Sequence, residues 1–336
     1  MTPISLAKPY LLFLGDAPSV LDAKTAGGIA HWRRGDCAGQ LRRPGAGADL
    51  GLPDMTIEAA AAAGARTLVI GVAPVGGGLP EAWVGLCTRA LEAGLDLAAG
   101  LHSRLSDIPA IAETAARAGR RIHDVRVPPP DLPCGTGAAR SGRRLLTVGT
   151  DCCVGKMFTA LAIERELHAR GRPTTFRATG QTGILIAGEG MPIDAVVSDF
   201  LSGAVEVLTP PADPAHWDVI EGQGSLFHPA YAAVSLGLLH GAQAEALVLC
   251  HEAGRTHVDG DYPGYALPPL AEAIAVNLAA ARLTCPAAEV VGLALNTSDL
   301  PEAEALALLD RLVGEHGLPA VDPVRTGVAA IVDRLA

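Results

Sequence analysis

A short segment near the middle of the chain, bounded by glycines, carries the residue types that bind phosphate. The apolar run Leu145–Val148 predicts a strand, and a helical pattern begins near Lys156. The loop between them can point backbone amides at phosphate oxygens, while the lysine and the helix N-terminus add positive charge. We therefore predict a phosphate-binding loop formed by Gly149, Thr150, Asp151, Cys152, Cys153, Val154, Gly155, Lys156 and Met157.

This segment is a P-loop with two departures from the usual pattern. Five residues rather than four separate Gly149 from Gly155, and Met157 stands where Ser or Thr would hold magnesium. The motif thus favours phosphate binding, but nucleotide hydrolysis does not follow from it. The alternative is a tight strand-to-helix turn with an incidental lysine.

A second apolar segment, beginning at Trp217, ends in Glu221 and a glycine turn. The carboxyl ends of neighbouring parallel strands share one edge of a sheet, so we expect this carboxylate beside the P-loop. An acid there can orient a metal-bound water or polarise a substrate amine. The alternative is a plain turn.

Polar side chains after other predicted strands are candidates for holding a small ligand. These are Arg177, Thr179, Gln181, Thr182 and Arg255. Asp199 precedes a further helical segment and would either act at the site or only cap that helix. The alternative for the other residues is that they belong to solvent-exposed polar loops.

The elements that must position these residues alternate along the chain. Strand-like apolar runs are separated by alanine-rich helical patterns, which is typical of parallel βαβ units and predicts an α/β fold. The segment Pro128–Ser141 is rich in proline and glycine and cannot sustain a helix or an interior strand. We therefore predict domains over residues 1–130 and 142–336, joined by a linker over 131–141.

Composition narrows the class of protein. Hydrophobic residues make up 49% of the chain and charged residues 18%, which supports packed cores rather than disorder. A formal charge of −10 argues against nucleic acid as a partner. We found neither a membrane-spanning run nor a signal peptide, so we expect a cytoplasmic protein that does not bind membranes. The seven cysteines form no CxxC pair, and we predict no metal site.

The motifs resemble those of known proteins. Gly149–Lys156 is similar to the P-loop of dethiobiotin synthetase, which has the same spacing and Thr-Asp at its start, and Glu221–Gly224 resembles its second acidic glycine motif. The wider order, which adds the Thr179–Gly183 loop and the Asp199–Glu206 segment, resembles the DgcN-like family. That family was long catalogued as a domain of unknown function, and its studied members are D-glutamate N-acetyltransferases.

The resemblance implies a Rossmann-like N-terminal domain followed by a P-loop NTPase-like domain with a parallel sheet. It also implies transfer of acetyl from acetyl-CoA to the amine of D-glutamate or a related D-amino acid. Lys156 and the loop amides would then hold the diphosphate of CoA, and Glu221, or else Asp199, would accept a proton from the amine. Arg177 or Arg255 would hold the carboxylates of the amino acid. We expect a small-molecule substrate and a homo-oligomer.

Two other functions stay open from the sequence. An ATP-dependent ligase or kinase similar to dethiobiotin synthetase would use Asp151 and Glu221 to bind Mg²⁺. A nucleotide-binding regulator would use the P-loop as a switch without turnover.

Overall fold

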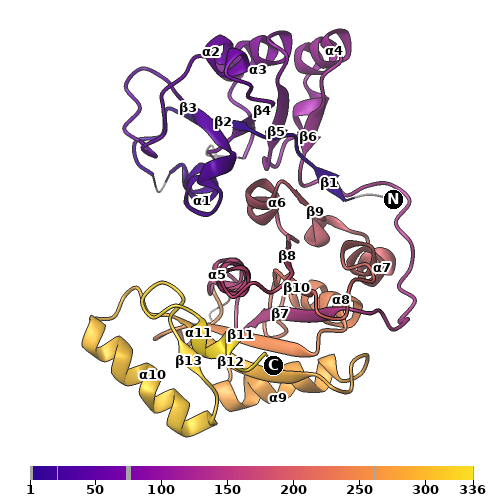
Figure 1. The fold of residues 1–336 in the computed structure, drawn as a ribbon, viewed down its shortest axis with the longest axis vertical. Helices are drawn as coiled ribbons and strands as arrows, with labels where there is room; N and C mark the ends of the chain where they lie inside the picture. The colour runs from indigo at the N-terminus through magenta and orange to yellow at the C-terminus, as the bar shows by residue number, and fades with distance from the viewer. Residues whose placement is uncertain (1–2, 21, 73–76, 261, 263, 336) are drawn as a thin grey trace. The chain divides into compact units, whose positions relative to one another are not determined.

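The computed structural model describes residues 3–20, 22–72, 77–260, 262 and 264–335. These residues form two compact units (Figure 1). One holds the described residues up to Pro129 together with Gly180–Ala195, and the other holds Pro130–Thr179 and the described residues from Val196 onward. Each unit is built on a parallel sheet with helices, so the predicted α/β class is confirmed.

The N-terminal unit has a sheet of five parallel strands. In sheet order these are β3 (Cys37–Arg42), β2 (Tyr10–Gly15), β4 (Thr67–Ile70), β5 (Asp96–Ala99) and β6 (Ile122–Asp124). Every residue of β2 and β4 is buried, as expected for central strands that are covered on both faces. The intervening helices are α1 (Lys24–Trp32), α2 (Ile57–Ala62), α3 (Glu81–Glu92) and α4 (Pro109–Ala118).

The segment Gly180–Ala195 packs in this N-terminal unit, whereas the sequence analysis assigned it to the domain over 142–336. Its helix α6 (Gln181–Ala187) lies against α1, where a Cβ added to Gly28 would come within 3.2 Å of Ile186 Cδ1. Its strand β9 (Glu189–Gly190) pairs antiparallel with β1 (Ile4–Ser5). The physical reason is that α6 contains a run of apolar residues that must be buried against another apolar surface. The order of residues along the chain does not show which unit provides that surface.

The C-terminal unit has a sheet of six parallel strands. In sheet order these are β13 (Ala320–Val321), β12 (Glu289–Asn296), β11 (Ala246–Glu252), β7 (Arg143–Gly149), β10 (Trp217–Ile220) and β8 (Thr174–Arg177). Its helices are α5 (Lys156–Ala169), α7 (Ser198–Leu208), α8 (Ala232–Ala242), α9 (Leu270–Ala281), α10 (Glu302–His316) and α11 (Ala329–Val332). None of the described helices has the length and apolar character needed to cross a bilayer.

Strand β7 occupies the position in this sheet where ligands are usually bound. The chain first builds the strands on one side of β7 and then, from β11 onward, the strands on the other side. Such a reversal opens a crevice at the carboxyl ends of the strands. The loop that follows β7 therefore begins at that crevice.

The residues predicted as a linker are held against α7 and α8 of the C-terminal unit. The Glu206 carboxylate accepts hydrogen bonds from Thr136 N at 2.9 Å and Gly137 N at 2.8 Å. Arg140 donates to Gly241 O at 2.7 Å. A Cβ added to Gly203 would lie only 1.9 Å from Pro133 O, so α7 and this segment approach too closely for a larger residue.

This close approach gives a stability prediction. Gly203→Ala should destabilise the protein by about 1–3 kcal/mol, because the added methyl group overpacks the contact with Pro133. Gly85→Ala, in α3, is the matched control: its Cβ would meet nothing within 4 Å, so helix propensity should stabilise that variant by about 0.5–1 kcal/mol. Urea unfolding of the full chain measures both. A Gly203→Ala variant as stable as the wild type would contradict the contact.

Candidate active site

The P-loop connects β7 to α5 and contains two residues with left-handed backbone angles. Strand β7 ends at Gly149, one residue beyond the predicted Val148, and α5 begins at Lys156 as predicted. Cys153 and Gly155 adopt left-handed backbone angles, with φ of 57° and 94°. Glycine takes this conformation freely, whereas cysteine does so at an energetic cost that is common where a loop serves a ligand.

The Lys156 side chain turns back toward the loop and binds one of its carbonyl groups. Its side chain is buried, and its Nζ donates a hydrogen bond to Asp151 O at 2.7 Å. A Cβ added to Gly149 would lie 3.0 Å from this Nζ, so the space beside the ammonium requires glycine. Burial lowers the pKa of Lys156, because the charged form loses hydration. An anion bound in the loop would restore a counter-charge to this ammonium.

The Asp151 carboxylate is fully buried and connects three parts of the unit. Its Oδ1 accepts from Cys152 N at 2.7 Å, while its Oδ2 accepts from Asp259 N at 2.7 Å and from Arg255 Nη1 at 3.0 Å. Arg255 also donates to Cys152 O at 3.0 Å and pairs with Glu252. The guanidinium predicted to bind an anionic ligand is thus engaged in holding the P-loop.

Glu221 lies directly after β10, and its turn is packed against the P-loop lysine. A Cβ added to Gly222 would come within 1.8 Å of Thr147 O and 3.0 Å of Lys156 Cδ. The Glu221 side chain is buried, with its Oε2 accepting from Thr179 N at 2.9 Å. Thr179 Oγ1 in turn donates to Glu221 O at 2.7 Å. The structure therefore brings together the P-loop, the acidic turn and one member of the predicted ligand loop.

The other predicted residues have different surroundings. Arg177 Nε donates to the buried carboxylate of Asp218 at 2.6 Å, so the neighbouring strand engages its guanidinium. Asp199 is exposed in the first turn of α7, where an acid also favours the helix dipole. Gln181 and Thr182 open α6 in the N-terminal unit. The catalytic and binding roles assigned to all these residues stay predictions.

His228, in the loop that follows the Glu221 turn, is a candidate site residue that no sequence pattern predicted. His228 is buried, and one of its ring nitrogens lies within 4.8 Å of an Asp151 carboxylate oxygen and of the Cys152 sulfur. Carboxylate, thiol and imidazole are all groups that can bind a metal ion. A histidine shortly after a strand-end acid was the available signal, but the pattern carries no spacing that distinguishes it from a structural residue.

The contacts of the His228 ring indicate which nitrogen carries its proton. Nδ1 accepts a hydrogen bond from Ala230 N at 3.1 Å, so the neutral ring is protonated at Nε2. The ring packs on those of Tyr231 and Tyr262, with centroids 4.5 and 4.9 Å away. His228 in this tautomer offers an N–H donor rather than a second lone pair, which suits an anion or a carbonyl oxygen better than a cation.

Both units match family models. A family model described as "Domain of unknown function (DUF1611_C) P-loop domain" matches residues 133–332. The corresponding N-terminal model, described as a Rossmann-like domain, matches residues 36–128. The chain belongs to the DUF1611 family. The predicted order of a Rossmann-like domain and then a P-loop domain is therefore confirmed.

Relatives of this DUF1611 chain match it over nearly its whole length. It is 54% identical over 328 residues to a D-glutamate N-acetyltransferase of Tritonibacter scottomollicae, covering 98% of both chains. It is 44% identical over 332 residues to a D-glutamate N-acetyltransferase of a Pseudoalteromonas species, covering 99% of this chain and 100% of that one. The crystal structure of a DUF1611 family protein from Anabaena variabilis matches with a TM-score of 0.82 and 36% identity, covering 98% and 99% of the two chains. The resemblance inferred from the motifs is confirmed.

Removing the charge of Asp151 tests how far the loop depends on it. Asp151→Asn should lower the stability of this DUF1611 protein by about 3 kcal/mol, because Arg255 loses its buried partner. Asp333→Asn is the matched control, since that carboxylate pairs with Arg170 while 66% exposed, and its loss should change the unfolding midpoint little. Thermal and urea unfolding compare the two variants. Equal midpoints for both would show that the buried network does not stabilise the fold.

Proposed function

We propose that the protein is an N-acetyltransferase that moves acetyl from acetyl-CoA to the amine of D-glutamate. One observation carries the proposal: a P-loop lysine lies beside the buried Glu221 turn in a chain that is 54% identical, over 98% of its length, to a D-glutamate N-acetyltransferase. The P-loop supplies an anion site for the coenzyme, and the turn supplies a carboxylate close to that site.

The composition of the P-loop favours acetyl-CoA over ATP as its ligand. Met157 offers no hydroxyl for Mg²⁺, so neutralisation of a bound diphosphate depends on Lys156 and the backbone amides. This is sufficient for CoA, whose diphosphate serves only as a handle. An ATP-dependent ligase or kinase transfers the phosphoryl group itself and needs the metal to stabilise the charge that develops.

The proposed reaction needs a proton acceptor at the amine. The neutral amine attacks the thioester carbonyl, the new N–C bond replaces the C–S bond, and CoA leaves as the thiol. At neutral pH the amine is an ammonium, so a base must first remove a proton. Glu221 is our first candidate for this base and Asp199 our second. Arg177 already donates its Nε to Asp218, and Arg255 donates its Nη1 and Nη2 to Asp151 and Glu252. Either side chain would hold a substrate carboxylate through its other donors or by exchanging these partners.

The first test of the proposal follows release of free thiol. The protein with D-glutamate and acetyl-CoA should release CoA thiol and form N-acetyl-D-glutamate, and Lys156→Ala should weaken CoA binding by about tenfold or more, since a charge-assisted hydrogen bond contributes about 1.5–3 kcal/mol. A thiol reagent measures turnover, and calorimetry measures the dissociation constant.

Two controls separate this reaction from the alternatives. Lys24→Ala removes an exposed lysine at the start of α1 and should leave CoA affinity unchanged. ADP formation from ATP and Mg²⁺ with D-glutamate, in place of thiol release, would favour the ligase or kinase. Unchanged affinity of Lys156→Ala for both CoA and ATP would remove the P-loop from the proposal.

The base is tested with a variant that keeps the shape of the side chain. Glu221→Gln retains an oxygen that can accept from Thr179 N but loses basicity, so kcat should fall by roughly 10² to 10⁴ with CoA affinity little changed. Steady-state kinetics over a range of pH provide the measurement. Near-normal turnover would exclude Glu221 as the base and leave Asp199 or His251. Asp199→Asn then tests the first of these at an exposed position.

A further inference from the structure

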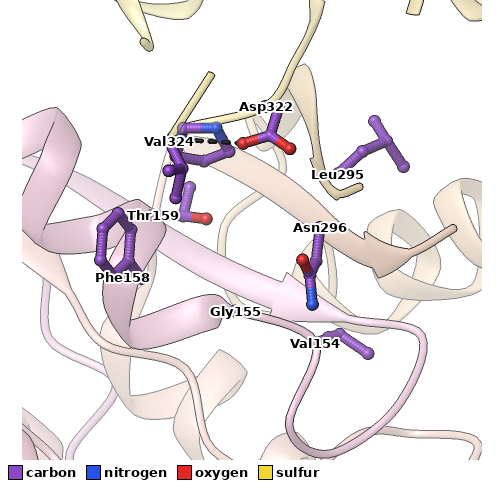
Figure 2. Close-up of a pocket in the computed structure, with 9 residues that line it drawn as sticks. Val154, Gly155, Phe158, Thr159, Leu295, Asn296, Asp322 and Val324 are labelled. Carbon is purple, nitrogen blue, oxygen red and sulfur yellow. Dashed lines mark hydrogen bonds between the residues drawn. The ribbon is translucent and has the colours of Figure 1, made fainter. Parts of the chain in front are cut away.

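An apolar pocket of about 210 Å³ opens beside the P-loop in the C-terminal unit (Figure 2). It is lined by Val154 and Gly155 of the loop, by Phe158 from the first turn of α5, and by residues at the carboxyl ends of β12 and β13. Val154 and Gly155 belong to both the P-loop and the pocket lining, so the pocket directly adjoins the loop. Drug-sized ligands occupy pockets of about 300–1,000 Å³, so this pocket has room for one ring system rather than a whole coenzyme.

Three polar side chains line the pocket, those of Thr159, Asn296 and Asp322, and the last two differ in what they can offer a ligand. The Asp322 carboxylate accepts from Thr297 N at 3.1 Å and from Val324 N at 2.8 Å, and it also accepts from Arg325 N and the Thr297 hydroxyl. It therefore holds the turn after β13 in shape. Asn296 is different: its Oδ1 accepts from Ser298 N at 3.1 Å, and its Nδ2 brings two donors to the pocket.

The remaining walls are suited to a flat ring. Figure 2 shows the Phe158 ring and the Asn296 amide on different sides of the pocket. Val324 lines the pocket with 74% of its surface exposed, so a bound ring would cover part of this aliphatic side chain. Stacking on an aromatic ring and apolar cover are general means of binding nucleobases.

We propose that this pocket binds the adenine ring of an adenosine diphosphate moiety whose phosphates lie in the P-loop. Both CoA and ATP contain this moiety; on the proposed function, on which the choice rests, the ligand is acetyl-CoA. Asn296 would pair with the adenine edge, its Nδ2 donating to a ring nitrogen and its Oδ1 accepting from the exocyclic amine. The pantetheine arm and its acetyl group would then extend from the other end of the diphosphate, outside the pocket.

Calorimetry on the full-length protein tests the pocket without relying on turnover. Wild-type protein should bind CoA and ADP, and should bind UDP at least tenfold more weakly than ADP because a pyrimidine fills less of the pocket. Asn296→Asp keeps the bond to Ser298 N but removes the donors, and Phe158→Ala removes the stacking ring. Each should weaken CoA and ADP binding by about tenfold and leave 4′-phosphopantetheine binding unchanged. Val313→Ala, an exposed valine in α10, is the matched control and should change nothing.

The possible results separate the pocket from the function. Equal losses for CoA and 4′-phosphopantetheine in Asn296→Asp, or UDP binding as tight as ADP binding, would overturn the adenine pocket even in an active acetyltransferase. ADP binding that depends on Asn296, in a protein that transfers no acetyl, would support the pocket while refuting the proposed function. Tighter binding of ATP than of CoA would keep the adenine site and change its ligand.

Discussion

The carboxylate of Asp151, removed from water inside the P-loop, fixes the relative positions of the loops that follow β7 and β11. A buried charge is tolerated only when it is fully paired, and here two backbone amides and the Arg255 guanidinium provide that pairing. The backbone carbonyl of Asp151 also accepts a hydrogen bond from Lys156 Nζ, so the same residue positions the lysine. The form of the P-loop, the position of its lysine and the loop's part of the pocket wall thus depend on Asp151.

The parts of the site that could be read from sequence are those with local signals. Gly149, Gly155 and Lys156 define a loop by their spacing, and Glu221 stands at the end of an apolar strand, where the geometry of parallel sheets places it near that loop. The fold class followed in the same way from alternating strands and helices. In these cases the sequence signal itself lies within a few neighbouring residues, even where the contact that it predicts joins distant parts of the chain.

The remaining contacts depend on tertiary pairing that no local pattern encodes. Arg177 looked available for a ligand, but register places Asp218 of the adjacent strand within its reach. Arg255 is similarly committed to Asp151, far away in the chain. His228 has no periodic or spaced companion, and its closeness to Cys152 appears only when the loops after β7 and β10 are folded.

Because Gly180–Ala195 belongs to the N-terminal unit, the two units cannot fold one after the other in chain order during synthesis. Chains emerge from the ribosome N-terminus first, and domains made of one continuous stretch can fold as soon as that stretch is released. Here β1 finds its partner β9, and α1 its partner α6, only after the ribosome has made β7, α5 and β8 of the other unit. The first unit to begin is therefore not the first that can be completed, and neither unit can be cut out of the gene as one uninterrupted piece.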